Sequence, residues 1–220
     1  QGVSSAASDV YKRQMTNDFR MSYFMPPIAP IKDEHGQLVT PPTLIPCCEV
    51  SVEQVFQMIT CNENLKVLTE QVRNSEDIRT AKASLLPYVT PCGTFSRRSS
   101  KCLIGPSLLT VVDIDYLTSY QEAVEMRKTL FNDPLLHPVL TFISPSGRGV
   151  KAFIPYNHLP TVDDANCITE KMKLAMLYTV MIYGTETPPP FGEKKKGVDF
   201  SGKDIVRSCF LCHDPGALFR

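Results

Sequence analysis

The stretch LLTVVDID at residues 108–115 decides the fold, because it joins an apolar, β-forming run to two carboxylates at its end. The segments that follow alternate between helix and strand signals. Ser119, next to a threonine, can cap a helix that stops at the Asn-Asp-Pro turn of residues 132–134. PVLTFIS at 138–144 and VKAFIP at 150–155 then predict two strands joined by a PSGRG turn.

A second helix and a last strand complete this part of the chain. Thr161 can cap the helix, and Met172 and Met176 fall on its apolar stripe. IVRSCFLC at 205–212 reads as the last strand. The order β-α-β-β-α-β is typical of an α+β protein with an RRM-like or ferredoxin-like core, in which a four-stranded antiparallel sheet carries two helices on one face.

The residues before this core have a different pattern. Residues 1–14 resemble a translated adaptor rather than native sequence, and we expect the native chain to begin near Met15. Residues 19–50 are rich in proline and predict an irregular arm with room for a short strand, whereas apolar residues at helical spacing predict helices from Val52 onward. We therefore divide the chain into the leader, a mainly helical extension at 15–107 and a core at 108–220 that is truncated at its C-terminal end.

Asp113 and Asp115 stand two residues apart, so both side chains should leave the same face of the strand. Two adjacent carboxylates repel each other, and a divalent cation relieves that repulsion at neutral pH. Mg²⁺ binds through one or two carboxylates and substrate phosphates, which suits phosphoryl transfer. The alternative is that the two acids merely end the strand and cap the next turn.

The segment SPSGRGVK at 144–151 has the composition of an anion-binding loop. Its glycines let backbone N–H groups approach a phosphate closely, its serines add hydroxyl donors, and its arginine and lysine add charge. The alternative is a plain hairpin loop. The candidate nucleotide-binding residues are Ser144, Ser146, Gly147, Arg148, Gly149, Lys151 and, from the last strand, Arg207.

Asp199 precedes the predicted last strand. In a β-α-β-β-α-β sheet the last strand usually lies beside the first, so Asp199 could join Asp113 and Asp115 as a third metal ligand. Arg207 could then reach a phosphate.

Composition narrows the function classes. Lys and Arg total 23, as do Asp and Glu, so nucleic-acid binding would depend on local patches. The chain has no apolar run long enough for a membrane span, and its eight cysteines fit reduced thiols in the cytoplasm. Cys209, Cys212 and His213 match a haem-attachment string, but haem attachment requires export and we expect no haem; a zinc site would need a fourth ligand.

Three segments resemble, in order, the motifs of archaeo-eukaryotic-type primases. They are VVDIDY at 111–116, SPSGRGVK at 144–151 and GVDFSGKDIVRSCFLCHDP at 197–215. More narrowly, they resemble the VirE N-terminal or primase-like domain of bacterial mobile-element proteins. KASLLP at 82–87 and TPCGTFSRR at 90–98 match the lead-in of that family.

The resemblance implies that Asp113, Asp115 and Asp199 hold Mg²⁺ or Mn²⁺ and that Ser146, Gly147 and Lys151 contact the nucleotide. In one respect the chain departs from the family, since many active primases have histidine where this chain has Lys151. Lysine neutralises phosphate as a point charge but lacks the titration range of imidazole.

We therefore expect a metal-dependent nucleotidyltransferase of the primase-polymerase type, acting in the replication of a mobile element or phage. Its partners would be nucleoside triphosphates, a single-stranded DNA template and a helicase or other domain beyond Arg220. One alternative is a catalytically inactive accessory module that binds nucleotide or single-stranded nucleic acid. Another is a purely structural or partner-binding domain.

Overall fold

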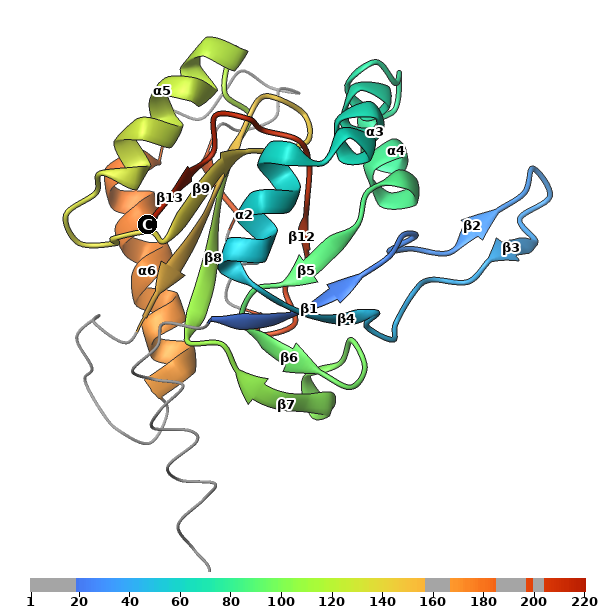
Figure 1. The fold of residues 1–220 in the computed structure, drawn as a ribbon, viewed down its shortest axis with the longest axis horizontal. Helices are drawn as coiled ribbons and strands as arrows, with labels where there is room; N and C mark the ends of the chain where they lie inside the picture. Colours follow the sequence, from blue (N-terminus) through green and yellow to red (C-terminus); the bar gives the residue numbers. More distant parts are fainter. Residues whose placement is uncertain (1–18, 157–166, 185–196, 200–203) are drawn as a thin grey trace, which may run out of the picture.

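The computed structural model describes residues 19–156, 167–184, 197–199 and 204–220. These residues form a mixed α/β structure with antiparallel sheets and five α-helices (Figure 1). The first elements are β1 (Arg20–Phe24), β2 (Ile31–Lys32), β3 (Leu38–Thr40), β4 (Cys48–Ser51), α2 (Val52–Cys61), α3 (Glu63–Arg73), α4 (Ile78–Leu85), β5 (Tyr88–Thr90), β6 (Gly93–Phe95) and β7 (Leu103–Pro106). The later elements are β8 (Leu109–Asp115), α5 (Tyr120–Phe131), β9 (Leu140–Ile143), β10 (Val150–Pro155), α6 (Cys167–Tyr183), β11 (Gly197–Val198), β12 (Cys209–Phe210) and β13 (Leu218–Phe219).

The larger sheet has five strands in the order β11-β8-β10-β9-β13, and all neighbouring strands are antiparallel. β8 pairs with β10 along its length, with Asp113 opposite Lys151. A second sheet has the order β12-β5-β1-β4, and β2-β3 and β6-β7 each pair only with each other. The β2-β3 hairpin extends away from the body of the molecule (Figure 1).

Residues of β8 alternate between two hydrophobic cores, as the two faces of a strand require. Val112 and Ile114 belong to a core closed by α5 and α6. Leu109 and Val111 belong to the other core, which includes α2 and strands of the second sheet. Accordingly, α5 and α6 lie on one side of the larger sheet and α2 on the opposite side (Figure 1). Asp113 and Asp115 share the strand face of Leu109 and Val111, so the acids face the N-terminal elements.

Both helices of the predicted core are present. α5 begins after Ser119, whose side chain accepts a hydrogen bond from the Glu122 N–H, and it ends at Asn132. Both ends confirm the prediction. Met172 and Met176 of α6 are buried, as expected from the apolar stripe. The predicted cap of this helix, Thr161, lies outside the described residues.

The last strand of the core was predicted wrongly. Within residues 205–212 only β12 is a strand, and it pairs with β5 of the smaller sheet. The place beside β8 belongs to β11, whose two residues pair with Asp115 and Ile114. A turn explains the difference: the Arg207 N–H donates to the Asp204 carbonyl (2.8 Å), so the chain changes direction before it reaches β12.

A mainly helical N-terminal extension is not confirmed. α2, α3 and α4 are present, but the strands β1, β4 and β5 form most of the second sheet. The expected irregular arm at 19–50 contains four of the strands. Short strands separated by proline-rich segments show little hydrophobic periodicity, so the sequence pattern did not reveal them.

The DPGA segment after β12 has a structural role. The carboxylate of Asp214 is buried, and its two oxygens accept hydrogen bonds from one nitrogen of Arg127, Nη1 (2.7 and 2.8 Å). Oδ2 of Asp214 also accepts a hydrogen bond from the Ile143 N–H (2.7 Å). A Cβ at Gly216 would lie 2.6 Å from the Arg127 guanidinium, which explains the glycine. Asp214 thereby ties the end of the chain to α5 and β9.

Among the helices that the structure describes, none combines the length and the apolar character needed to cross a membrane.

Candidate metal centre

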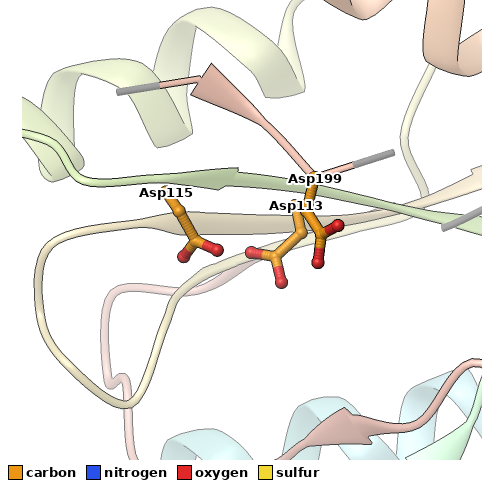
Figure 2. A group of neighbouring side chains, drawn as sticks. All are labelled: Asp113, Asp115 and Asp199. Atoms are coloured by element: carbon orange, nitrogen blue, oxygen red, sulfur yellow. The ribbon is translucent and has the colours of Figure 1, made fainter. Parts of the chain in front are cut away.

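Three carboxylates converge at the end of β8. Asp113 and Asp115 leave the same face of the strand, and Asp199 follows β11 directly (Figure 2). Because Val198 pairs with Ile114, and the Asp199 N–H donates to the Asp113 carbonyl (2.9 Å), antiparallel pairing sets Asp199 beside Asp113. One ligand oxygen from each of the three acids lies within 4.8 Å of the other two. This convergence is the arrangement expected from the sequence.

Two cations lie against the acids. The Lys151 ammonium forms an ion pair with Oδ2 of Asp113, and both side chains are buried. The Arg207 guanidinium forms an ion pair with Oδ2 of Asp199 and lies 3.9 Å from Oδ2 of Asp113. Arg207 was expected inside a strand; it lies instead in the irregular segment before β12, yet it reaches the site.

One oxygen at the centre has no partner among the described residues. Asp113 is only 6% exposed, and its Oδ1 atom is buried without a hydrogen bond. A buried, unpaired carboxylate oxygen is costly unless a ligand satisfies it. Together with the spacing of the three acids, this oxygen fits the hard oxygen coordination of a divalent metal ion. The residues present could therefore bind such an ion.

The pKa values reflect the crowding of charge. Burial raises the pKa of Asp115, and the charge of Asp113 raises it further, while Lys151 and Lys82 oppose the rise. Burial alone would lower the pKa of Lys151, but Asp113 and Asp115 outweigh it and raise the pKa above its ordinary value. Lys151 is therefore charged at neutral pH, and burial beside Asp113 disfavours the ionised form of Asp115.

The segment 144–149 forms the loop between β9 and β10, and it abuts the acids at one point. The Ser144 N–H donates to the Gly149 carbonyl (2.8 Å), and the hydroxyls of Ser144 and Ser146 are hydrogen bonded to each other (3.1 Å). A Cβ on Gly149 would lie 2.9 Å from Oδ1 of Asp115. Gly147 has a positive φ of 73°, and the Arg148 Nε donates to the Leu117 carbonyl (3.0 Å). The loop thus begins and ends beside Asp115, while Arg148 braces the segment after β8.

Two basic residues outside the expected set adjoin the site. Lys82 of α4 lies over the Phe210 ring (5.7 Å), and its pKa is lowered first by burial and then by Lys151, while Asp115 and Asp113 raise it. Arg73 of α3 donates to the Pro145 carbonyl (3.2 Å). Lys82 had appeared only within the KASLLP resemblance, and helical spacing gave no signal that Lys82 would lie near the acids or Arg73 near the 144–149 loop.

The two cysteines of the cysteine–histidine segment belong to a hydrophobic core. Cys209 and Cys212 are buried, and burial raises the pKa of their thiols to about 11 and about 12, respectively. The Cys212 thiol donates to the Ile143 carbonyl (3.1 Å). In the described part of the chain the one cluster of potential metal ligands is Asp113, Asp115 and Asp199.

The family model described as BT4734-like, N-terminal domain, matches residues 80–219, which is more than half of the chain. The match begins on α4 and includes all three acids, Lys151 and Arg207. No curated protein and no solved structure matches the chain significantly.

Proposed function

We propose that this chain, which belongs to the BT4734-like N-terminal domain family, is a metal-dependent nucleotidyltransferase of the primase-polymerase type. The observation that carries the proposal is the convergence of Asp113, Asp115 and Asp199 around the unpaired Oδ1 of Asp113, with Lys151 and Arg207 beside them. Carboxylates for metal next to cations for phosphate are what phosphoryl transfer requires.

The topology supports the same proposal. We interpret the chain order β8-α5-β9-β10-α6-β11 and the sheet order β11-β8-β10-β9 as an RRM-like arrangement extended by β13. In such a sheet the first and third strands are central, so Asp113 on β8 and Lys151 on β10 lie on adjacent central strands. We infer that this pair of strands is the floor of a nucleotide site.

Each group has a distinct role in the proposed reaction. A bound Mg²⁺ or Mn²⁺ would supply charge stabilisation to the transferring phosphate and would lower the pKa of the attacking 3′-hydroxyl. Asp113, Asp115 and Asp199 would fix the position of the ion. Lys151 and Arg207 would neutralise the triphosphate, and the serines and glycines of the 144–149 loop would orient it.

The proposed setting rests on the resemblance of the three motifs to the primase-like domain of mobile-element proteins. Substrates would be nucleoside triphosphates and a single-stranded DNA template, in replication of a mobile element or phage in the cytoplasm. A non-catalytic nucleotide-binding module is the second candidate, favoured by the pairing of Lys151 with Asp113, because this pair neutralises part of the acidic charge without a metal.

Primer extension tests catalysis. The chain is incubated with primed single-stranded DNA, nucleotides and Mg²⁺ or Mn²⁺, beside Asp199→Asn and the control Glu53→Gln, an exposed acid on α2. Loss of a residue that only hydrogen bonds to a metal ligand lowers metal affinity or activity by about 10–100-fold. Loss of the ligand Asp199 itself should therefore reduce the extension rate by about 100-fold or more. Glu53→Gln should match the unmodified chain.

Equal extension by Asp199→Asn and the unmodified chain would contradict the proposal, as would no extension with either metal. Nucleotide binding that persists in a chelator and in Asp199→Asn, without extension, would favour the non-catalytic module.

A further inference from the structure

We propose that Lys151 and Arg207 occupy the acids in the metal-free protein, so that a divalent cation and a nucleoside triphosphate bind cooperatively by exchanging these ion pairs. The inference rests on the proposed function and adds a rule for how the site fills: neither ligand binds well without the other.

The ion pairs use the atoms that each ligand needs. Lys151 contacts Oδ2 of Asp113, and Arg207 contacts Oδ2 of Asp199 while lying 3.9 Å from Oδ2 of Asp113. A metal ion held by the three acids would compete for these same oxygens. A triphosphate bound by Lys151 and Arg207 would compete for the same donors.

A metal ion alone faces a penalty. It must displace Lys151 from Asp113, and the Lys151 side chain, only 10% exposed, would remain charged without a counter-charge. An uncompensated buried charge is strongly unfavourable. The unpaired Oδ1 of Asp113 gives the ion a first ligand, but full coordination still requires the exchange.

A triphosphate alone faces the complementary penalty. Its phosphates would have to draw Lys151 and Arg207 away from Asp113 and Asp199. The freed carboxylates would then repel the phosphates in a partly buried site, where charges are poorly screened.

Together the two ligands remove both penalties. The metal ion takes the carboxylates, the triphosphate takes the lysine and the arginine, and every charge keeps a partner. Because coupling between two binding sites is reciprocal, the metal must raise triphosphate affinity by the factor by which triphosphate raises metal affinity.

The experiment measures Mn²⁺ binding to the full chain by calorimetry, without nucleotide and with a non-hydrolysable nucleoside triphosphate. The known affinity of Mn²⁺ for the free analogue is subtracted. Lys151→Met and Arg207→Met are compared with Lys173→Met, which removes the same charge from an exposed position on α6. Arg207 is more exposed than Lys151, so its variant remains informative if Lys151→Met does not fold.

Removing a competing cation should raise Mn²⁺ affinity in the absence of nucleotide, by about 5-fold or more, and should lower affinity for the Mn²⁺–triphosphate complex. The opposite directions of these two changes identify the exchange, because a structural defect would weaken both the binding of Mn²⁺ alone and the binding of the Mn²⁺–triphosphate complex. Lys173→Met should change neither.

Mn²⁺ affinity that is unchanged or reduced in Arg207→Met without nucleotide would overturn the exchange, even if primer extension proceeds. An unmodified chain that binds no Mn²⁺, with or without the analogue, would overturn the proposed function as well.

Discussion

Asp113 and Asp115 are two residues apart on one strand, but their electrostatic surroundings differ. Asp113 is paired with the buried Lys151, whereas Asp115 has a pKa raised by burial and by the charge of Asp113. One carboxylate is therefore stabilised by the metal-free fold and the other is disfavoured by it. Strain of this kind is expected where a site is organised for a ligand rather than for stability.

Replacing each acid by asparagine should therefore change the free energy of unfolding in opposite directions. Asp113→Asn removes the ion-pair partner of the buried Lys151 and should lower the free energy of unfolding by about 3–5 kcal/mol at pH 7. Asp115→Asn removes an unfavourable charge and should raise it. Urea unfolding in a chelator measures both changes.

The pH dependence provides the control. Since the pKa of Asp115 is raised by folding, the folded chain holds the extra proton, and stability falls as pH rises from the ordinary carboxyl pKa through the raised one. The advantage of Asp115→Asn should be full above that window and absent below it. An advantage that is independent of pH would contradict this explanation.

At the scale of elements, the loop between β9 and β10 depends on glycine at its last position. A Cβ on Gly149 would lie 2.7 Å from the Ile114 carbonyl and 2.9 Å from both Oδ1 of Asp115 and Oγ of Ser144. Gly149→Ala should therefore displace Asp115 and reduce Mn²⁺ affinity by about 10-fold or more, as second-shell changes do. Isothermal titration in the presence of the nucleotide analogue measures the loss.

Gly105→Ala is the matched control, because its Cβ would meet nothing closer than the Thr94 hydroxyl at 3.9 Å. If both variants bind Mn²⁺ equally, then the loop does not position Asp115.

Elements with a strong local signal were predictable from sequence. β8, β9 and β10 are apolar runs bounded by turn residues, and α5 has a capping serine and an Asn-Asp-Pro stop. β11 could not be predicted, because Gly197 and Val198 form a strand only through pairing with β8. β12 was assigned to the wrong sheet, since the partner of an edge strand is decided by the turn before it rather than by its own residues.

The residues of the site likewise divide into those whose positions the sequence predicted and those whose positions it did not. The three acids converge as expected, but Asp199 joins them through β11 rather than through the strand predicted at 205–212. Only the closeness of Asp113 and Asp115 could be inferred from strand position. The ion pair between Lys151 and Asp113 could not, because it depends on the antiparallel register of β8 and β10. Lys82 was missed as a neighbour of the acids because it comes from α4, outside the expected core.

At the scale of the whole molecule, the larger sheet packs against other elements on both faces. Its second face packs against N-terminal elements in one hydrophobic cluster, in which residues from β8, β9 and β10 meet α2, β1, β4 and β5. β12 also completes the N-terminal sheet by pairing with β5. The matched family region likewise begins at residue 80, within α4. The expected boundary at residues 107 and 108 thus falls between two parts that share a core.

A fragment of residues 108–220 should therefore fail to fold cooperatively. It would expose side chains of that cluster, among them five large apolar residues of β8, β9 and β10, namely Leu109, Val111, Leu140, Phe142 and Phe153. Burying each such side chain contributes about 1.5–3 kcal/mol, so the loss would be about 8–15 kcal/mol. That loss equals the entire stability of a typical domain, which is about 5–15 kcal/mol. Thermal unfolding and binding of a hydrophobic dye, compared with residues 15–220, measure the outcome. A sharp transition and no dye binding by the fragment would mean that 108–220 is an independent domain, and that the N-terminal elements only cover it.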